Sequence, residues 1–472
     1  MSPSATALLI ILGIVGIGSF IGFRAGAHRK MDLEQWTVAG RGFGLVLVWL
    51  LMAGEVYTTF SFLGASGWAY SRGGPALYIL AYLVLAYVVS FYILPPIWEV
   101  GRAHGLQTQP DFFKHCFGSE FLAALVALVG VVSIIPYLQL QLVGMGIIVE
   151  VASFNGITHT AAMVIAAVLV AGFVFVSGMR AVAWVSVVKD LLLLFAAVAI
   201  GIVVPYRWFG GIGPMFRTLI HTDASHFTMS GPEKHLGHLW FISTVLLTSL
   251  GFYMWPHSFG ASFTAKSGDT LRRNAIVMPL YTLALPLVFF AGFAAIQIIP
   301  GLSNGDLSLL ILVRKTFHPW FLGVVGGAGA LTAMVPSAIL TLTAATLFAK
   351  NLYRPLFAHR MSEEQVASLA RRMAIVLMAA ALLFALKSSS TIVTLLLLGY
   401  AGVTQFFPGI VLGLFWRRAS RDGVFCGLLI GITTVVFLIL TGRDPFLGFN
   451  AGFVALALNF TVTVFICLGT DS

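Results

Sequence analysis

Charged residues are scarce in this 472-residue chain. They make up 9% of it, whereas hydrophobic residues make up 59%, and the mean hydropathy is +0.97. Soluble domains hold about 25% charged residues, so this composition excludes a soluble globular protein and indicates a polytopic protein of the lipid bilayer. The net charge of +10 follows from basic residues placed in loops, so we expect no nucleic-acid partner.

Cysteine and catalytic motifs are also lacking. The three cysteines, Cys116, Cys426 and Cys467, do not have the spacing of metal ligands. The chain has no Walker motif, no dinucleotide fingerprint and no paired metal ligands. We therefore expect no enzyme, no catalytic residue, no metal and no cofactor. Without a nucleotide-binding cassette, the energy source for transport should be an ion gradient.

Long apolar runs are abundant, and at about 20 residues per crossing thirteen of them can span a bilayer. They predict an all-α polytopic membrane protein. The segments are 5–23, 45–70, 76–98, 119–149, 158–177, 181–205, 239–263, 275–299, 321–348, 371–388, 390–416, 422–441 and 449–468. The first is interpreted as a retained helix because it has no basic start and no clear cleavage site.

Lysine and arginine are distributed unevenly between alternate loops. One side of the predicted membrane holds 18 of them and the other side holds 8. The richer side is expected to be cytoplasmic. This places the N-terminus outside and the C-terminus in the cytoplasm, in a plasma membrane or a bacterial inner membrane.

Two of the predicted spans are interrupted in corresponding ways. Span 45–70 carries Gly54 and Glu55, and span 239–263 carries Gly251, Pro256 and His257. Glycine permits unwinding and proline removes a backbone donor, so both helices can expose polar backbone at mid-membrane. The breaks are five spans apart, which is the spacing of two inverted five-helix repeats around a shared substrate site.

Glu55, Lys189 and Asp190 are charged residues that lie well inside predicted spans. Glu55 is predicted to take part in proton transfer because intramembrane carboxylates are costly, the alternative being a structural carboxylate bonded to backbone. Lys189 is followed by Asp190, but side chains at i and i+1 point about 100° apart. Lys189 is therefore expected to face another helix, either in a static ion pair or as a titrating group.

Further polar residues within the spans could contact a substrate or relay a proton. His257 follows Pro256 and is either such a group or a packed imidazole. Gln139 and Gln141 are two residues apart and cannot both face one pocket, so one of them is expected to serve a helix contact. The candidate substrate-binding residues are Tyr57, Thr58, Thr59, Ser61, Tyr137, Gln141, Tyr253, Trp255, His257 and Gln405.

Several segments, in the correct order along nearly the whole chain, resemble the sodium/solute symporter family. WTVAGRGFG is similar to its entry motif, FLGASGWAYSRGGPAL to its first core helix and SGMRAVAWVSVVKD to its fifth. PHSFGASFTAKSGDTLRRNA resembles the end of the sixth, LTAMVPSAILTLTAATLFAKNLYRP the eighth, and GLFWRRASRDGVFCGLLIG the tenth-to-eleventh junction.

The resemblance implies a LeuT-type fold with alternating access, in which ten core helices follow one extra N-terminal helix and precede two C-terminal ones. The chain then divides into the extra helix with its loop (1–44), the first repeat (45–205), an extracellular loop (206–238), the second repeat (239–416) and the two C-terminal helices (417–472).

The sequence departs from the family at the position of the coupling ion. The family holds sodium with backbone oxygens in the first core helix, here nearest Gly54 and Tyr57, and with two hydroxyls on the eighth. Those hydroxyl positions fall on Val335 and Pro336, which have no side-chain oxygen. Sodium, by analogy with other hard cations, needs about five or six oxygen ligands. The candidate ion-coupling residues are Gly54, Glu55, Tyr57, Ser186, Lys189, Asp190, Val335, Pro336 and Ser337.

An ammonium group can occupy the place of a monovalent cation. We therefore expect Lys189, paired with Glu55, to take up and release H⁺ where relatives bind Na⁺. The segments GEVYTTFSFLGASGWAY and SIIPYLQLQLVGMGIIVEVA look most like the monocarboxylate-permease branch, which implies a small organic anion such as lactate or pyruvate. The alternatives are a Na⁺-coupled symporter for an amino acid or vitamin and, less favoured, a membrane sensor with a transporter fold.

Overall fold

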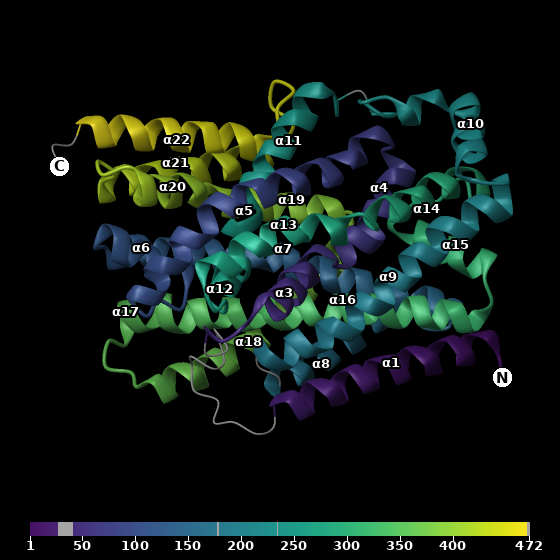
Figure 1. Cartoon of the computed structure of the whole chain (residues 1–472), viewed down its shortest axis with the longest axis horizontal. Coiled ribbons are helices and arrows are strands. Elements are labelled where there is room, and N and C mark those ends of the chain that lie inside the picture. The colour runs from purple at the N-terminus through teal and green to yellow at the C-terminus, as the bar shows by residue number, and fades with distance from the viewer. Residues whose placement is uncertain (27–40, 177–178, 234, 470–472) are drawn as a thin grey trace.

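The computed structural model describes residues 1–26, 41–176, 179–233 and 235–469. Within these ranges the secondary structure is helical, apart from isolated bridges that join Phe43 to Ala265 and Phe446 to Phe449. The two termini lie at opposite ends of the helix bundle (Figure 1). The predicted all-α membrane fold is confirmed.

In the described part of the chain, ten helices are long and apolar enough to cross a membrane, and two bent pairs bring the number to twelve. The apolar part of helix α8 (His159–Val176), residues 159–174, is shorter than a membrane crossing usually needs. The count of thirteen therefore stays a prediction.

The first repeat opens with a broken helix. Helix α3 (Leu45–Val56) is followed by a π-helical turn, η2 (Phe60–Gly64), and by α4 (Ala65–Ser71), with a bend of 51° between the halves. Hydroxyl groups replace helical partners at the bend, since Thr58 N donates to Ser61 Oγ and Ser61 Oγ donates to Val56 O. The remaining helices are α5 (Tyr78–Ala103), α7 (Glu120–Ala152), α8 and α9 (Met179–Phe209).

The second repeat also opens with a broken helix. Helix α11 (His238–Gly251) and the 3-10 turn η5 (Phe252–Met254) are bent by 55° relative to α12 (Pro256–Ser262). Trp255 is extended because the residue before a proline avoids the helical region. The repeat continues with α13 (Gly268–Thr282), α14 (Leu285–Ile298), α16 (Pro319–Thr346), η7 (Leu347–Tyr353), α17 (Arg354–Phe357), α18 (Glu363–Lys387), α19 (Ile392–Val403), η8 (Thr404–Phe406) and α20 (Phe407–Phe415).

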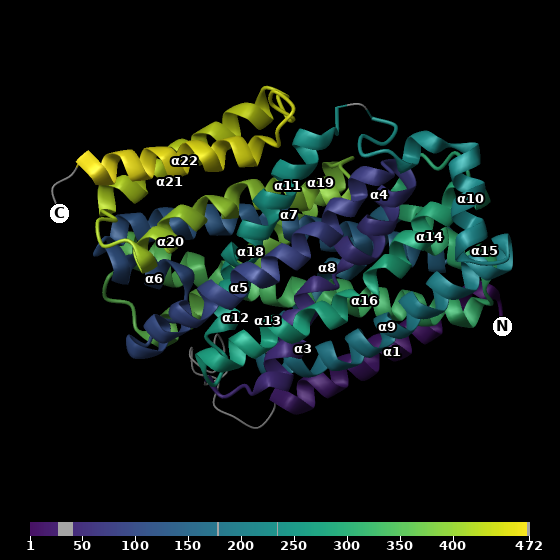
Figure 2. The ribbon, with the colours of Figure 1, turned by 45° about the horizontal axis from the view of Figure 1, so that its top comes forward.

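The extra helices lie at opposite edges of the bundle. Helix α1 (Pro3–Gly26) packs against α16 and α9, and α21 (Arg421–Leu440) and α22 (Ala451–Gly469) lie side by side at the other edge (Figure 2). Asn459 Nδ2 donates to the backbone and side-chain oxygens of Gln405 at 2.8 and 3.1 Å, which ties α22 to η8.

Short helices cover the two ends of the bundle. Helix α6 (Gln109–Phe117) follows α5 at the end predicted to be cytoplasmic. Helices α10 (Ile212–Thr222) and α15 (Ser308–Thr316), with the turns η3 (Gly74–Leu77), η4 (Ala224–Phe227) and η6 (Gly305–Leu307), lie toward the other end. The predicted loop 206–238 thus contains α10, and α9 extends to Phe209.

Candidate functional site

The two broken helices meet at Glu55. Its Oε2 accepts a hydrogen bond from Ser258 Oγ and lies 3.7 Å from His257 Nε2, which is too long for a hydrogen bond. Both Glu55 and His257 are buried. Within the described chain, Glu55 Oε1 and His257 Nδ1 have no hydrogen-bond partner. Because buried polar atoms are seldom left unpaired, these two atoms are available to a substrate or a proton.

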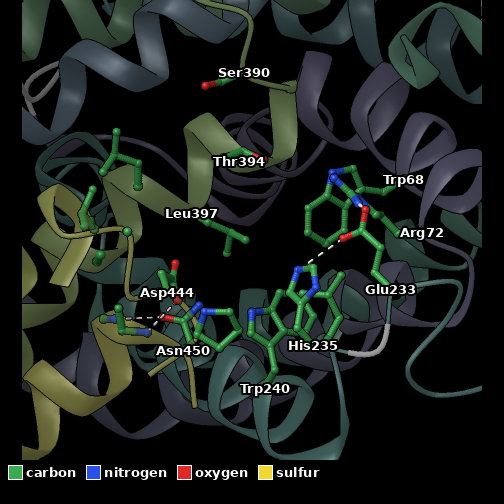
Figure 3. A pocket seen from close by; sticks show the side chains of 18 residues that line it. Trp68, Arg72, Glu233, His235, Trp240, Ser390, Thr394, Leu397, Asp444 and Asn450 are labelled. Carbon is green, nitrogen blue, oxygen red and sulfur yellow. Dashed lines mark hydrogen bonds and ion pairs between the residues drawn. The ribbon is translucent and has the colours of Figure 1, made fainter. Parts of the chain in front are cut away.

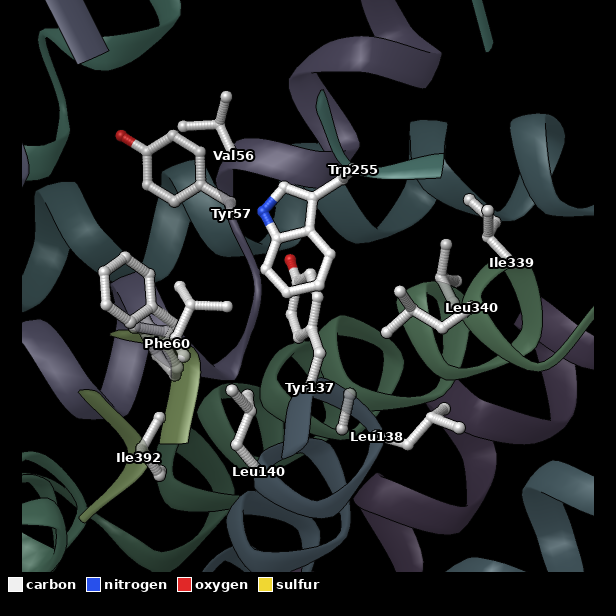
Figure 4. Packing of buried hydrophobic residues seen from close by; sticks show 14 of the residues in the cluster. Val56, Tyr57, Phe60, Tyr137, Leu138, Leu140, Trp255, Ile339, Leu340 and Ile392 are labelled. Atoms are coloured by element: carbon white, nitrogen blue, oxygen red, sulfur yellow. The ribbon is translucent and has the colours of Figure 1, made fainter. Parts of the chain in front are cut away.

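An inner cavity of about 10 Å³ lies between the breaks. A single water needs about that much space, so the site is closed and a larger substrate requires helix movement. The rings of Tyr137 and Trp255 both line it and contact each other, with centroids 4.9 Å apart and planes inclined by 56° (Figure 4). The residues that line the cavity are Glu55, Val56, Phe60, Tyr82, Tyr137, Phe252, Trp255, His257, Ser258, Leu396 and Tyr400.

An outer pocket of about 440 Å³ lies toward the predicted extracellular end (Figure 3). Trp68 and Trp240 form one wall, and Arg72 makes an ion pair with Glu233 beside them. A series of aromatic contacts leads from this wall to the inner cavity, with centroid distances of 5.6 to 6.0 Å. The contacts are Trp240 with Tyr78, Tyr78 with Tyr82, and Tyr82 with Tyr400. These rings separate the outer pocket from the inner cavity.

Lys189 places a cation in the break of the first core helix. Its Nζ donates to Gly54 O at 2.6 Å and to Tyr57 O at 3.0 Å, and the side chain is fully buried. The same Nζ lies 3.1 Å from Asp190 Oδ1. An ammonium has three donors and no acceptor, and here it faces three oxygens.

Asp190, and not Glu55, is the ion-pair partner of Lys189 among the described residues, so the predicted Lys189–Glu55 pair is wrong. The two Cβ directions do differ, as the helix geometry requires. However, the four-carbon stem of lysine lets Nζ reach Asp190 and a second helix together. The expectation that Lys189 faces another helix is met by its bonds to α3.

Gly54 is helical, and the segment that unwinds is 57–58. A Cβ at Gly54 would lie 3.1 Å from Ser186 Oγ and 3.4 Å from Lys189 Nζ. The glycine therefore permits close approach of α9 rather than unwinding. This differs from the sequence interpretation, which placed the opening of the helix at Gly54.

The eighth core helix, α16, passes Val335 and Pro336 without interruption. Both residues are buried, and neither has a side-chain oxygen. The Ser337 hydroxyl donates to Ala333 O at 2.7 Å within the same helix. These three residues thus present no free hydroxyl donor.

The other candidates fall into two groups. Tyr137, Trp255 and His257 line the inner cavity, whereas Tyr57, Thr58, Thr59, Ser61, Gln141, Tyr253 and Gln405 are outside its lining. Thr59 Oγ1 donates to Gln141 Oε1 at 2.6 Å, which joins η2 to α7. Gln405 Nε2 donates to Ala401 O and Gly452 O, so its amide faces α22.

Sequence reasoning missed several residues that line the cavity. Ser258 directly follows His257, and its place beside the second break could have indicated it. Tyr82, Phe252, Leu396 and Tyr400 lie in apolar runs and give no local signal.

Two bent helices that enclose a small site, within two repeats and three extra helices, define a secondary transporter with a LeuT-type fold. The chain belongs to the sodium:solute symporter family, whose model matches residues 36–431. It is therefore an integral membrane transporter for a small solute and not an enzyme.

Relatives and a solved structure agree with this family. The chain is 46% identical to the uncharacterized symporter YhjB of Bacillus subtilis (98% of this chain and 97% of the relative). It is 28% identical to a monocarboxylate transport permease protein of Rhizobium johnstonii (98% and 96%). The fold matches that of a Na⁺-coupled sialic acid symporter with a TM-score of 0.80 at 18% identity (98% and 96%).

Proposed function

We propose that this protein is a proton-coupled symporter that takes up small monocarboxylates such as lactate or pyruvate by alternating access. The observation that carries the coupling is the position of Lys189, whose Nζ binds Gly54 O and Tyr57 O in the helix break. In the sodium/solute symporters that the sequence resembles, backbone oxygens of this break hold the coupling ion.

The Lys189 ammonium occupies the carbonyl oxygens of the break that a metal cation would need. Sodium would need about five or six oxygens, by analogy with other hard cations. The two carbonyls already accept from the ammonium, and Val335 and Pro336 have no side-chain oxygen, whereas the Ser337 hydroxyl donates its proton to Ala333 O within α16. A tethered ammonium can lose and regain a proton, so Lys189 with Asp190 acts as the coupling group.

The inner cavity supports an acidic substrate that arrives with a proton. Glu55 Oε1 is unpaired there, and a substrate carboxylate beside an ionised Glu55 would be repelled. Two adjacent carboxyl groups are stable when they share one proton. The substrate therefore binds together with H⁺, and His257 and Tyr137 supply polar contacts. The likeness to the Rhizobium permease agrees with this substrate class.

A second candidate is a sodium-coupled symporter for an amino acid or a vitamin. Membership of the sodium:solute symporter family favours it, because that family is named for sodium coupling. In that case the cation would bind outside the Lys189 contacts.

Uptake into proteoliposomes separates the two. Labelled lactate, pyruvate and an amino acid would be offered under an inward proton gradient without sodium, and under a sodium gradient at equal pH on both sides. We expect accumulation of the monocarboxylates under the proton gradient alone. Uptake that requires sodium and persists without a pH difference would refute proton coupling, and uptake restricted to the amino acid would refute the substrate class.

A further inference from the structure

The short helix α6 is anchored to the end of α16 through its N-cap. Thr108 and Asp111 form a reciprocal capping box. Asp111 Oδ2 accepts from Lys350 Nζ and its Oδ1 accepts from Asn351 Nδ2, both at 2.8 Å. Burial raises the pKa of Asp111, but the Lys350 ammonium and these hydrogen bonds outweigh it and hold the pKa below its usual range. The anchor is therefore the charged Asp111 carboxylate of α6, which is hydrogen-bonded to Lys350 and Asn351 of η7.

The residue after this N-cap reaches the other broken helix. Gln109 is fully buried, and its Nε2 donates to Met254 O at 2.9 Å. Met254 ends η5 directly before Trp255, whose ring lines the inner cavity. Carbonyls at a helix end lack donors from their own helix, so the Gln109 amide satisfies a group that the break exposes.

Aromatic contacts extend the same bridge. Phe112 of α6 packs on Phe259 of α12 with ring centroids 5.6 Å apart. Phe113 packs on Phe406 of η8 at 6.2 Å. Helix α6 thus touches the second half of the second broken helix and two further core helices at the predicted cytoplasmic end.

We infer that Gln109 is a positioning residue that holds the Met254–Trp255 break and, through α6, latches α12 to η7 until the site opens toward the predicted cytoplasmic side. Separation of α12 from η7 breaks the Gln109–Met254 bond. The inference rests on the transporter family and the fold, and it is independent of the identity of the substrate and of the coupling ion.

Helix α6 carries its own reporter of this latch. Cys116 is half-buried, and burial raises the pKa of its thiol to about 11. Alkylation requires the thiolate, so the docked helix reacts slowly and an undocked helix reacts faster. Mass spectrometry of the peptide that holds Cys116 gives the rate of its alkylation by N-ethylmaleimide, so the other two cysteines need not be mutated.

The test compares Gln109→Met with Gln139→Met in the full-length protein. Gln139 Nε2 also donates to a backbone carbonyl, Phe384 O at 3.3 Å, but it joins α7 to α18 away from both breaks. Each substitution removes one amide donor and keeps the length of the side chain. Gln109→Met should speed alkylation of Cys116 about fivefold, which corresponds to the ~1 kcal/mol of one hydrogen bond, and Gln139→Met should leave the rate unchanged.

A second readout separates positioning from a general loss of stability. Because Trp255 lines the cavity, Gln109→Met should raise KM for uptake of the transported solute more than it lowers the maximal rate. If Gln109→Met does not fold, Gln109→Leu, which has an apolar side chain and no donor, replaces it. Equal Cys116 rates in the Gln109 and Gln139 variants would overturn the inference. The Cys116 alkylation rate can be measured without a known substrate, so the inference can fail separately from the proposed function.

Discussion

Replacement of Lys189 by methionine tests the coupling hypothesis most directly. The substitution removes the ammonium and keeps an unbranched side chain of similar length. Gly54 O and Tyr57 O lose their bonds of 2.6 and 3.0 Å, and Asp190 loses the cation 3.1 Å away. Breaking a buried ion pair from one side costs about 3–5 kcal/mol, because the remaining charge is left uncompensated.

The expected result has two parts. Lys189→Met should lower the unfolding temperature in detergent, and it should abolish accumulation driven by a proton gradient. The double variant Lys189→Met with Asp190→Asn should regain part of the stability, because no unpaired charge remains, but it should not regain coupling.

Lys315→Met is the matched control. Lys315 Nζ also donates to a backbone carbonyl, Ile298 O at 2.7 Å, but it lies outside the candidate site. This control should transport as the wild type does. Proton-driven accumulation by Lys189→Met at the wild-type level would refute the coupling role and leave Lys189 a structural charge.

Three further predictions address other parts of the molecule. Glu55→Gln should abolish pH-driven accumulation in liposomes while the protein stays folded, and normal accumulation would remove Glu55 from the mechanism. Burial raises the pKa of Asp306, which lies between spans in η6, from 3.8 to about 7, so its contribution to stability is lost as the pH rises through that range. Asp306→Asn keeps an acceptor for Ile392 N. The free energy of unfolding of this variant should exceed that of the wild type at pH 8, by at most about 4 kcal/mol, and should equal it at pH 4. Equal stability of the two proteins at both pH values would contradict this. Gln405→Leu removes the bonds to α22 and should lower the free energy of unfolding by about 1–3 kcal/mol without changing KM. A raised KM with an unchanged unfolding temperature would instead indicate that Gln405 binds the substrate.

Much of the fold could be predicted from local sequence. Long apolar runs with few charges identify the spans, because backbone groups in lipid must be bonded within a helix. The motifs around Glu55 and His257 indicate the two broken helices, and the structure bends the chain beside both. Their predicted positions were less accurate, since Gly54 remains helical and the chain unwinds at 57–58.

The site was predicted less completely. Glu55, Tyr137, Trp255 and His257, which the sequence indicated as candidates, line one cavity, and Tyr82 and Tyr400 join them from helices with no polar signal. Gln405 has the same ambiguous sequence context as Gln141, and only its contacts with Gly452 and Asn459 show which way it faces.

The sequence by itself determined that this protein spans a membrane, that it resembles the symporters and that two of its helices are broken. Those properties depend on hydrophobic length, glycine, proline and short motifs, which are local. Only the tertiary structure decided that Lys189 pairs with Asp190 and binds the carbonyls of α3. Residues separated by more than a hundred positions meet there, and the reach of a flexible side chain between packed helices cannot be obtained from helix periodicity alone.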